Sequence, residues 1–471
     1  MAVLTVLAAI VRLPGLDSGL WFDEIVTLVE SVRRPLNVVL TTFEYNNHPL
    51  YSLLTHVSVQ GLGEHAWSIR LPAYVFGVAA IPILYGLATV VTTRAEALWC
   101  ALLLGVSYHH VWFSQNARGY TALLFFTLLA TLLLMKAMQQ PPPIGPIGAI
   151  AYGVAAGLGI YTHLTMAFVV MAHAVIWGSH VAGESSVAKR WQYLRAGGVA
   201  LAVTAVVSAL GYLPMLGTML AILSKPAPHA SAAVATPRWA VLEALRGLRV
   251  GFGMFGALAA FSLVGVGILD YSRHNRLATL TFLLPGVITG VALIAARAAI
   301  RPRFFFAFLP FGLLFVVRGA MQCGRVLEER TRLHVRRRRI AGTAIVSVIA
   351  ILSAAALRDN YRYPKQDFDG ALRFIESHRA PNESVVTGGL AIFPYTQYYN
   401  RSWPGIEHPA QFDALRGRPS RVWVVYSFEE YMDHQLVEQL RQSCQPQRTF
   451  PGTLAGGDVI VCTIEADRSG S

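Results

Sequence analysis

The chain has 471 residues, of which 54% are hydrophobic and only 14% are charged. This balance excludes an ordinary soluble enzyme of that length and is typical of a polytopic membrane protein. The formal net charge of +13 does not indicate nucleic-acid binding, because membrane proteins concentrate Lys and Arg in their cytoplasmic loops.

Eleven apolar segments are candidates for membrane crossing. The first, near 1–13, is apolar for about 11 residues, which is below the roughly 17 that a crossing needs. Either it continues through Arg12 and Leu13 with the charge reaching the interface, or its start lies upstream. The other predicted crossings lie near 71–91, 95–113, 120–138, 146–162, 164–181, 197–217, 250–270, 277–296, 303–318 and 340–357.

The loop charges predict the orientation of these crossings. With a cytoplasmic amino terminus, Arg94, Lys136, Lys189 and the run Arg336–Arg339 all fall on the inner side, as the positive-inside rule requires. We interpret that run as a topological anchor. The protein is then a multi-pass protein of the inner (plasma) membrane, surrounded by membrane lipids. Its first outer loop (14–70) and everything after residue 357 are periplasmic or extracellular.

A soluble domain is predicted after the last crossing. Residues 358–471 regain charge, and helix-like stretches (368–378 and 429–443) alternate with strand-like stretches (384–388, 421–427 and 458–465), which indicates a small α/β domain. It contains no Gly-rich phosphate loop at a strand-to-helix turn. Cys444 and Cys462 both fall here, and an oxidising compartment permits a disulfide, but two unpaired thiols are equally compatible with the sequence.

The outer segments collect polar groups that membrane proteins otherwise avoid. The stretch "GLWFDEIVTL" places two adjacent carboxylates, Asp23 and Glu24, behind two aromatics, in a loop expected to form helices along the membrane surface. The stretches "NNHPLYSLL", "FSQNARGY", "YTHL" and "RAAIRPRFFF" add the other candidate site residues, which are His48, Arg118, Tyr120, His163, Arg301 and Arg303.

These residue types suit an anionic, lipid-linked substrate. Arginine binds phosphate oxygens through two parallel hydrogen bonds, and the interaction strengthens near a low-dielectric medium; Arg118, Arg301 and Arg303 are the candidates. A carboxylate beside a membrane-facing cavity can serve as general base for an acceptor hydroxyl, and we predict this role for Asp23. A phosphate leaves without a strong acid once its charge is stabilised. Attack from the opposite face inverts the anomeric centre.

Six motifs in order carry a resemblance to a known family: "LWFDEIVTL", "NNHPLYSLL", "WSIRLPAYVFG", "FSQNARGYTALLFF", "YTHLTMAF" and "RPRFFFAFLP". They resemble the membrane-embedded GT-C glycosyltransferases, in particular the bacterial protein mannosyltransferase-like and lipid A aminoarabinose transferase-like group (family 39/83-like). The resemblance covers residues 1–318. It implies a mainly α, polytopic GT-C fold with a catalytic membrane domain over 1–357, a polyprenyl-phosphate sugar donor and a periplasmic active site. Asp23 matches the catalytic carboxylate and Glu24 its acidic neighbour, and we predict both to be catalytic residues, with Glu24 orienting the base or a phosphate partner. Arg118 and Arg303 lie on the phosphate-handling side.

The chain departs from the family pattern in three places. Phe304 follows Arg303 where the family usually has Tyr, and Pro49 stands alone where two prolines are common. His48 occupies the position at which the aminoarabinose transferases carry a phosphate-contacting lysine. The donor sugar (hexose or pentose) and the use of a divalent metal therefore stay open, and no other cofactor is implied.

Other interpretations compete with catalysis. The acidic pair can cap an interfacial helix, Arg118 can be an interfacial anchor, and His48 and His163 suit structural roles better than metal ligation. A lipid-linked sugar transporter or flippase would also need cationic outer residues, but it should show ionisable groups deep within its spans. A ligase that transfers whole oligosaccharides is hardly separable by sequence. The acceptor can be a lipid, a glycan or a protein.

Overall fold

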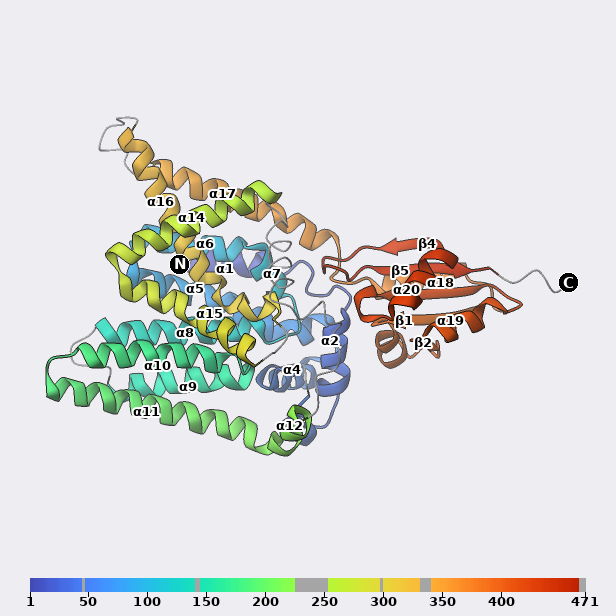
Figure 1. The fold of residues 1–471 in the computed structure, drawn as a ribbon, viewed down its shortest axis with the longest axis horizontal. Coiled ribbons are helices and arrows are strands. Elements are labelled where there is room, and N and C mark those ends of the chain that lie inside the picture. The colour runs from blue at the N-terminus through green and yellow to red at the C-terminus, as the bar shows by residue number, and fades with distance from the viewer. Residues whose placement is uncertain (45–46, 140–144, 225–252, 297–299, 331–339, 466–471) are drawn as a thin grey trace.

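The structure is a computed structural model that describes residues 1–44, 47–139, 145–224, 253–296, 300–330 and 340–465. The predicted basic run Arg336–Arg339 lies outside these residues. A large helical body is joined to a smaller sheet domain, and the short helix α2 (Phe22–Thr27) lies at the end of the body that faces the sheet domain (Figure 1). We call this the sheet-facing end.

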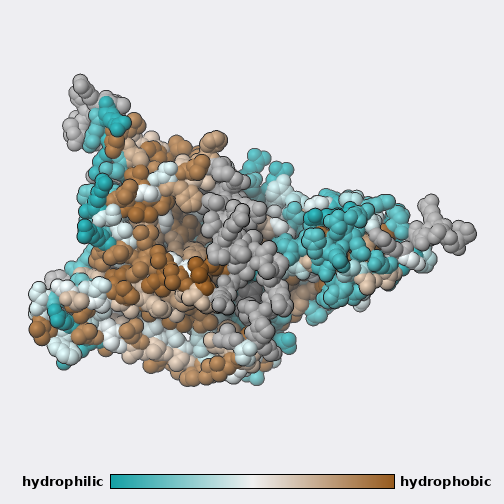
Figure 2. Space-filling view, in the orientation of Figure 1, coloured by the Kyte–Doolittle hydropathy of each residue, from teal (hydrophilic) through white to brown (hydrophobic). Residues whose placement is uncertain are grey.

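Eight helices in the described part of the chain are long and apolar enough to cross a membrane, and the surface over them is largely hydrophobic (Figure 2). The prediction of a polytopic helical membrane protein is confirmed, while the count of eleven crossings stays a prediction. These helices are α5 (Ala66–Val91), α8 (Tyr120–Gln139), α10 (Met166–Gly183), α11 (Val187–Tyr212) continued by η2 (Leu213–Met215) and α12 (Leu216–Leu223), α14 (Gly253–His274), α15 (Arg276–Ala295), η3 (Pro302–Phe308) with α16 (Leu309–Arg330), and α17 (Ile340–Arg362).

Shorter helices complete the body. Four of them stand at three predicted crossings: α1 (Ala2–Val11), α6 (Arg94–Val106) with α7 (Tyr108–Ser114), and α9 (Pro146–Thr162). The first outer loop forms short helices, as expected, before α5 begins. They are α2, the π-helix η1 (Leu28–Val32), α3 (Leu36–Thr41) and α4 (Pro49–Leu62).

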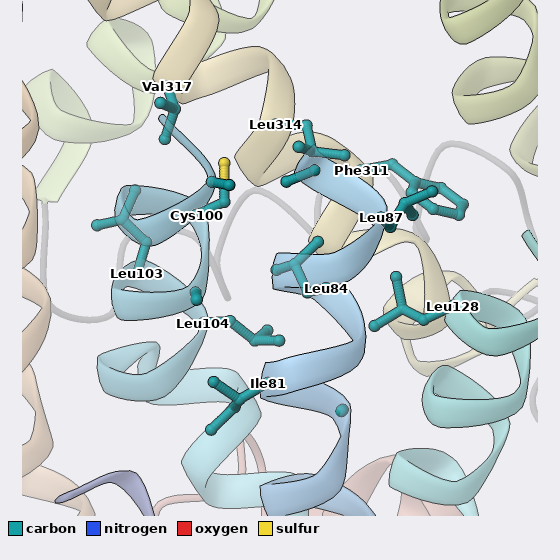
Figure 3. Close-up of a cluster of buried hydrophobic side chains, with 14 of the residues drawn as sticks. Ile81, Leu84, Leu87, Cys100, Leu103, Leu104, Leu128, Phe311, Leu314 and Val317 are labelled. Atoms are coloured by element: carbon teal, nitrogen blue, oxygen red, sulfur yellow. The ribbon is translucent and has the colours of Figure 1, made fainter. Parts of the chain in front are cut away.

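The core of the body is formed where α5, α6, α8 and α16 meet (Figure 3). Leu84 of α5, Leu104 of α6 and Leu128 of α8 are fully buried there. Close helix packing also depends on glycine, because a Cβ on Gly319 of α16 would lie 2.0 Å from the Leu263 carbonyl oxygen of α14. Small residues let membrane helices approach in this way.

The sheet domain contains a five-stranded sheet of order β2-β1-β3-β5-β4. β1 pairs in parallel with β2 and β3, whereas β5 is antiparallel to β3 and β4. The buried side chains of α18 share one cluster with Val385, Trp423 and Val461, while those of α19 and α20 share another with Val424 and Cys462, so helices cover both faces. The elements are α18 (Phe368–His378), β1 (Ser384–Gly389), η5 (Pro394–Tyr398), β2 (Gly405–Ile406), α19 (Pro409–Arg416), β3 (Val422–Ser427), η6 (Glu429–Tyr431), α20 (His434–Ser443), β4 (Gln445–Phe450) and β5 (Val459–Ile464).

The small α/β domain is therefore confirmed as a fold, and it differs in detail from the sequence analysis, which did not predict helix α19. The helix expected over 429–443 is split into η6 and α20, because Asp433 is extended and its carboxylate accepts hydrogen bonds from the Gln435 and Leu436 N–H groups as an N-cap. Two strands were not predicted: β2 has two residues, and β4 is a polar edge strand whose first five residues are exposed. Cys444 and Cys462 form a disulfide.

Candidate active site

Helix α2 carries both predicted carboxylates at the sheet-facing end. Its six residues are too few to be stable as an isolated helix, so surrounding contacts must hold it. The Trp21 indole N–H donates to Asn116 Oδ1 at 3.1 Å and the Trp21 ring packs against Trp112. Asp23 and Glu24 are both largely buried, but they face different surroundings.

Glu24 belongs to a closed ion pair. Its side chain and that of Arg70 are both fully buried, and the guanidinium donates from Nε to Oε1 at 2.8 Å and from Nη2 to Oε2 at 2.6 Å. The Ala117 N–H also donates to Oε1 at 2.7 Å, and the Trp21 N–H donates to Oε2 at 3.2 Å. Burial alone would raise the pKa of Glu24, but the charge and hydrogen bonds of Arg70 outweigh it and lower that pKa. Glu24 is therefore an ionised, fully coordinated group that caps α2.

Asp23 is the less buried carboxylate of the two. Its Oδ2 accepts a hydrogen bond from Arg303 Nη1 at 3.0 Å, in an ion pair whose side chains keep 10% and 25% exposure. Arg303 lies in η3, 280 residues away in sequence. Among the described residues, Arg303 Nε has no hydrogen-bond partner although it is buried. One N–H of the guanidinium is thus left without an acceptor in the described part of the chain.

Two histidines and a tyrosine lie against this ion pair. The His48 ring lies 4.8 Å from the Tyr120 ring and 5.0 Å from the His163 ring, measured between centroids, and Phe304 packs on His163 at 5.6 Å. A Cβ on Gly119 would lie 3.0 Å from His48 Nδ1 and 3.0 Å from Thr162 Cγ2. The glycine of "ARGY" is therefore what allows these three segments to meet.

Both histidines are held neutral. Burial lowers the pKa of His48 well below its ordinary value, and the nearby Arg118 guanidinium lowers it further. Burial followed by the charges of Arg118 and Arg303 lowers the pKa of His163 to about 3. The Thr165 N–H donates to His163 Nδ1 at 3.2 Å, so the ring proton is on Nε2. His48 and His163 therefore act as hydrogen-bonding groups and not as cations.

The remaining predicted residues divide between the centre and the rim of the site. Arg118 is buried and donates from Nη1 to Thr27 Oγ1 of α2 at 2.9 Å. Arg301 lies further out and donates from Nη1 to the Tyr431 hydroxyl of the sheet domain at 3.0 Å. Within the described residues, no group of three or more His, Cys, Asp or Glu side chains could hold a metal ion.

Sequence reasoning did not identify Arg70, although it stands in the quoted motif "WSIRLPAYVFG". A signal was present, because a charge within an apolar helix needs a partner. It also did not identify Gln115, Lys365 and Gln366, which join this site to the sheet domain. No local pattern marks those residues, since their partners are distant in sequence.

Comparisons with known proteins find the same overall fold. A family model described as dolichyl-phosphate-mannose-protein mannosyltransferase matches residues 46–210. No curated protein sequence matches the chain. The crystal structure of ArnT from Cupriavidus metallidurans bound to undecaprenyl phosphate is similar with a TM-score of 0.54 and 14% identity, covering 100% of this chain and 99% of that one. The archaeal oligosaccharyltransferase AglB from Archaeoglobus fulgidus, in complex with an inhibitory peptide and a dolichol-phosphate, is similar with a TM-score of 0.55 and 14% identity, covering 98% of this chain and 74% of that one.

These similarities define the class of protein. The chain is a multi-pass membrane protein with the GT-C fold, as its sequence motifs predicted. At 14% identity the solved structures establish the fold alone, so the reaction has to be argued from the residues at the sheet-facing end.

Proposed function

We propose that this protein is a glycosyltransferase that moves a sugar from a polyprenyl-phosphate donor to an acceptor hydroxyl at the sheet-facing end. One observation carries the proposal: the Asp23 carboxylate, whose side chain keeps 10% exposure, lies 3.0 Å from Arg303, whose Nε has no hydrogen-bond partner among the described residues. Arg118, His48 and His163 border the pair and add one further cation and two neutral hydrogen-bonding rings.

Each group has a role in the proposed reaction. The acceptor oxygen attacks the anomeric carbon, and its proton passes to the Asp23 carboxylate. The bond between that carbon and the donor phosphate oxygen breaks, and the polyprenyl phosphate leaves with the electron pair. Arg303 and Arg118 stabilise the phosphate charge. The base and leaving group lie on opposite faces of the sugar, so the anomeric configuration inverts. No step is assigned to a metal.

Two further features support the proposed location. A disulfide between Cys444 and Cys462 suits an oxidising compartment, and the sheet domain contacts the site end of the body through Arg301 and Tyr431. The site and the sheet domain would both lie on the periplasmic or extracellular side of the inner membrane, with the amino terminus in the cytoplasm. A carboxyl-terminal reporter that is active only in the cytoplasm would contradict this topology.

The decisive experiment compares two neighbouring aspartates. Asp23→Asn keeps the shape of the side chain but removes its basicity, so transfer should fall by ~10²-fold or more while donor binding stays nearly intact. Asp17→Asn makes the same change at an exposed position of the same loop and should leave transfer unchanged. Purified protein in nanodiscs would be given a panel of polyprenyl-phosphate sugars, with acceptors chosen by mass spectrometry of envelope glycans and glycolipids from cells with and without the protein. A stable Asp23→Asn protein with wild-type transfer would show that Asp23 is not the base.

A further inference from the structure

One side-chain amide connects the sheet domain to the helix that carries Asp23. Gln366, which is 1% exposed, accepts a hydrogen bond through Oε1 from the Phe22 backbone N–H at 3.0 Å. Its Nε2 donates to Ser427 Oγ at 3.0 Å and to the Gly457 carbonyl oxygen at 3.1 Å. Phe22 is the first residue of α2, directly before Asp23, while Ser427 ends β3.

The partners determine which way this amide points. A backbone N–H can only donate and a backbone carbonyl can only accept, so the amide oxygen must face Phe22 and the nitrogen must face Gly457. A buried bridge of this kind needs an acceptor and a donor at the tip of one side chain. Glutamine meets the requirement at neutral charge, whereas leucine offers neither group and ionised glutamate offers no donor.

Helix α2 depends on such outside partners. Its first N–H groups have no acceptor within the helix. Glu24, held by Arg70 of the helical body, accepts from the Trp21 N–H, and Gln366 accepts from the Phe22 N–H. The backbone just before Asp23 is therefore fixed from the helical body on one side and from the sheet domain on the other.

The chain around Gln366 is itself tied to the helical body. Lys365 Nζ donates to the Gln115 carbonyl oxygen at 2.6 Å, and Asn360 Nδ2 donates to Gln115 Oε1 at 2.7 Å. Gln115 Nε2 in turn donates to the Arg12 carbonyl oxygen at 3.0 Å. Gln366 therefore has little freedom to follow α2 if that helix moves.

We propose that Gln366 is a positioning residue for sugar transfer: through it the sheet domain holds α2 so that the Asp23 carboxylate meets Arg303 and the acceptor hydroxyl together. The inference rests on the proposed function, because it takes Asp23 as the base. It makes the sheet domain a structural part of the active site, acting through hydrogen bonds to residues that do not touch substrate.

The first test uses Gln366→Leu, which removes the hydrogen bonds at similar volume. Misplacing the base should lower kcat by about tenfold, the equivalent of one to two hydrogen bonds. KM for the donor should change less than about twofold, because Arg303 and Arg118 keep their positions. The matched control is Gln447→Leu in the same domain, where Gln447 Nε2 donates to Thr463 Oγ1 at 3.0 Å on the edge strand. It should keep the wild-type kcat.

The second test uses Gln366→Glu and a pH profile. A protonated glutamic acid presents a carbonyl acceptor and an O–H donor as the amide does, whereas the carboxylate directs a charge at the Gly457 carbonyl. The ratio of variant to wild-type kcat should therefore rise as the pH falls from about 8 to about 5, as more of the introduced carboxyl is protonated. A flat ratio, or a Gln366→Leu protein with kcat within twofold of wild type, would overturn the inference.

Hydrogen exchange separates this inference from the proposed function, because it needs no substrate. Amides of residues 22–28 should exchange about tenfold faster in full-length Gln366→Leu than in wild type or Gln447→Leu, as expected when a helix loses an anchoring hydrogen bond. If Gln366→Leu exchanges faster but the wild-type protein transfers no sugar from polyprenyl phosphate, the proposed reaction is refuted. The anchoring of α2 by Gln366 then still stands. Unchanged exchange in an active protein would refute the role of Gln366.

Discussion

The two ends of the helical body both contain arginine–carboxylate groups, but they differ in how many acceptors each arginine has. At the end opposite the sheet domain, Arg318 of α16 donates from Nε to Asp270 of α14 at 2.5 Å and from Nη1 to Glu96 of α6 at 3.4 Å. At the sheet-facing end, Arg303 has one carboxylate, Asp23, and its Nε has no partner within the described chain.

This difference separates structural from chemical use of charge in an apolar protein. Removing two charges from water is costly, and mutual pairing with good geometry offsets the cost. The cluster around Arg318 achieves this by joining three helices through two carboxylates. The pair at Asp23 leaves one arginine N–H, that of Arg303 Nε, without a hydrogen-bond acceptor in the described chain, and a substrate phosphate is bound by such N–H groups.

The largest change is expected when the cluster of Arg318, Asp270 and Glu96 is disrupted. Arg318→Met leaves Asp270 and Glu96 close together without their cation, so the free energy of unfolding should fall by roughly 3–5 kcal/mol. Transfer per folded molecule should be unchanged, because the cluster lies at the opposite end from the site. Thermal unfolding in nanodiscs and transfer per active molecule measure the two properties separately.

The control for that variant is Arg373→Met, which breaks the exposed pair with Asp369 on α18. It should alter stability by less than about 1 kcal/mol, since exposed ion pairs contribute little. If Arg318→Met stayed stable but lost transfer, the cluster would have a part in function and the contrast between the two ends would be wrong.

A smaller effect is expected from Arg303→Lys, which alters the ion pair with Asp23. Lysine keeps the charge near Asp23 but loses the planar fork, so kcat/KM should fall about tenfold at donor concentrations well below saturation. Arg33→Lys is a matched control, because Arg33 makes a two-point contact with Glu64 on the surface of the same outer loop. Wild-type kcat/KM in Arg303→Lys would show that the Arg303 guanidinium does not bind the donor phosphate.

A further effect is a pH dependence of stability at the junction with the sheet domain. Burial, and then the charge of Arg70, lowers the pKa of Lys365 from 10.5 to about 7, although Glu24 acts in the opposite direction. Between those two pH values the unfolded chain holds a proton that the folded chain does not, so stability should rise with pH across this window. In Lys365→Met this rise should be lost.

The measurement for Lys365 is Tm between pH 7 and pH 10, with a difference of a few degrees expected for a chain of this size. Lys189→Met, at an exposed position of α11, should keep the wild-type slope. An identical slope in Lys365→Met would mean that Lys365 stays charged in the folded protein.

Much of the architecture could be predicted from local sequence. Long apolar segments have few stable alternatives to a membrane helix, because every backbone group must find a partner in lipid. The helix Phe368–His378 and the strands β1, β3 and β5 follow from hydrophobic period and β-branched runs. Strand β4 could not be predicted in this way, since an exposed polar strand owes its conformation to pairing with β5.

The candidate site also has features that local sequence predicts and features that it does not predict. The residue types near α2 could be predicted from the sequence, because polar groups such as Asp23, His48 and Arg303 stand out at the ends of apolar segments. Their pairing could not: the structure shows that Arg70 encloses Glu24 while the neighbouring Asp23 contacts Arg303, and that Gln366 hydrogen-bonds to their helix. The physical reason is that an ion pair or a buried hydrogen bond depends on the distance between two groups in space, and the chain brings these groups together across separations of 46 to 344 residues without any local sequence pattern to mark them.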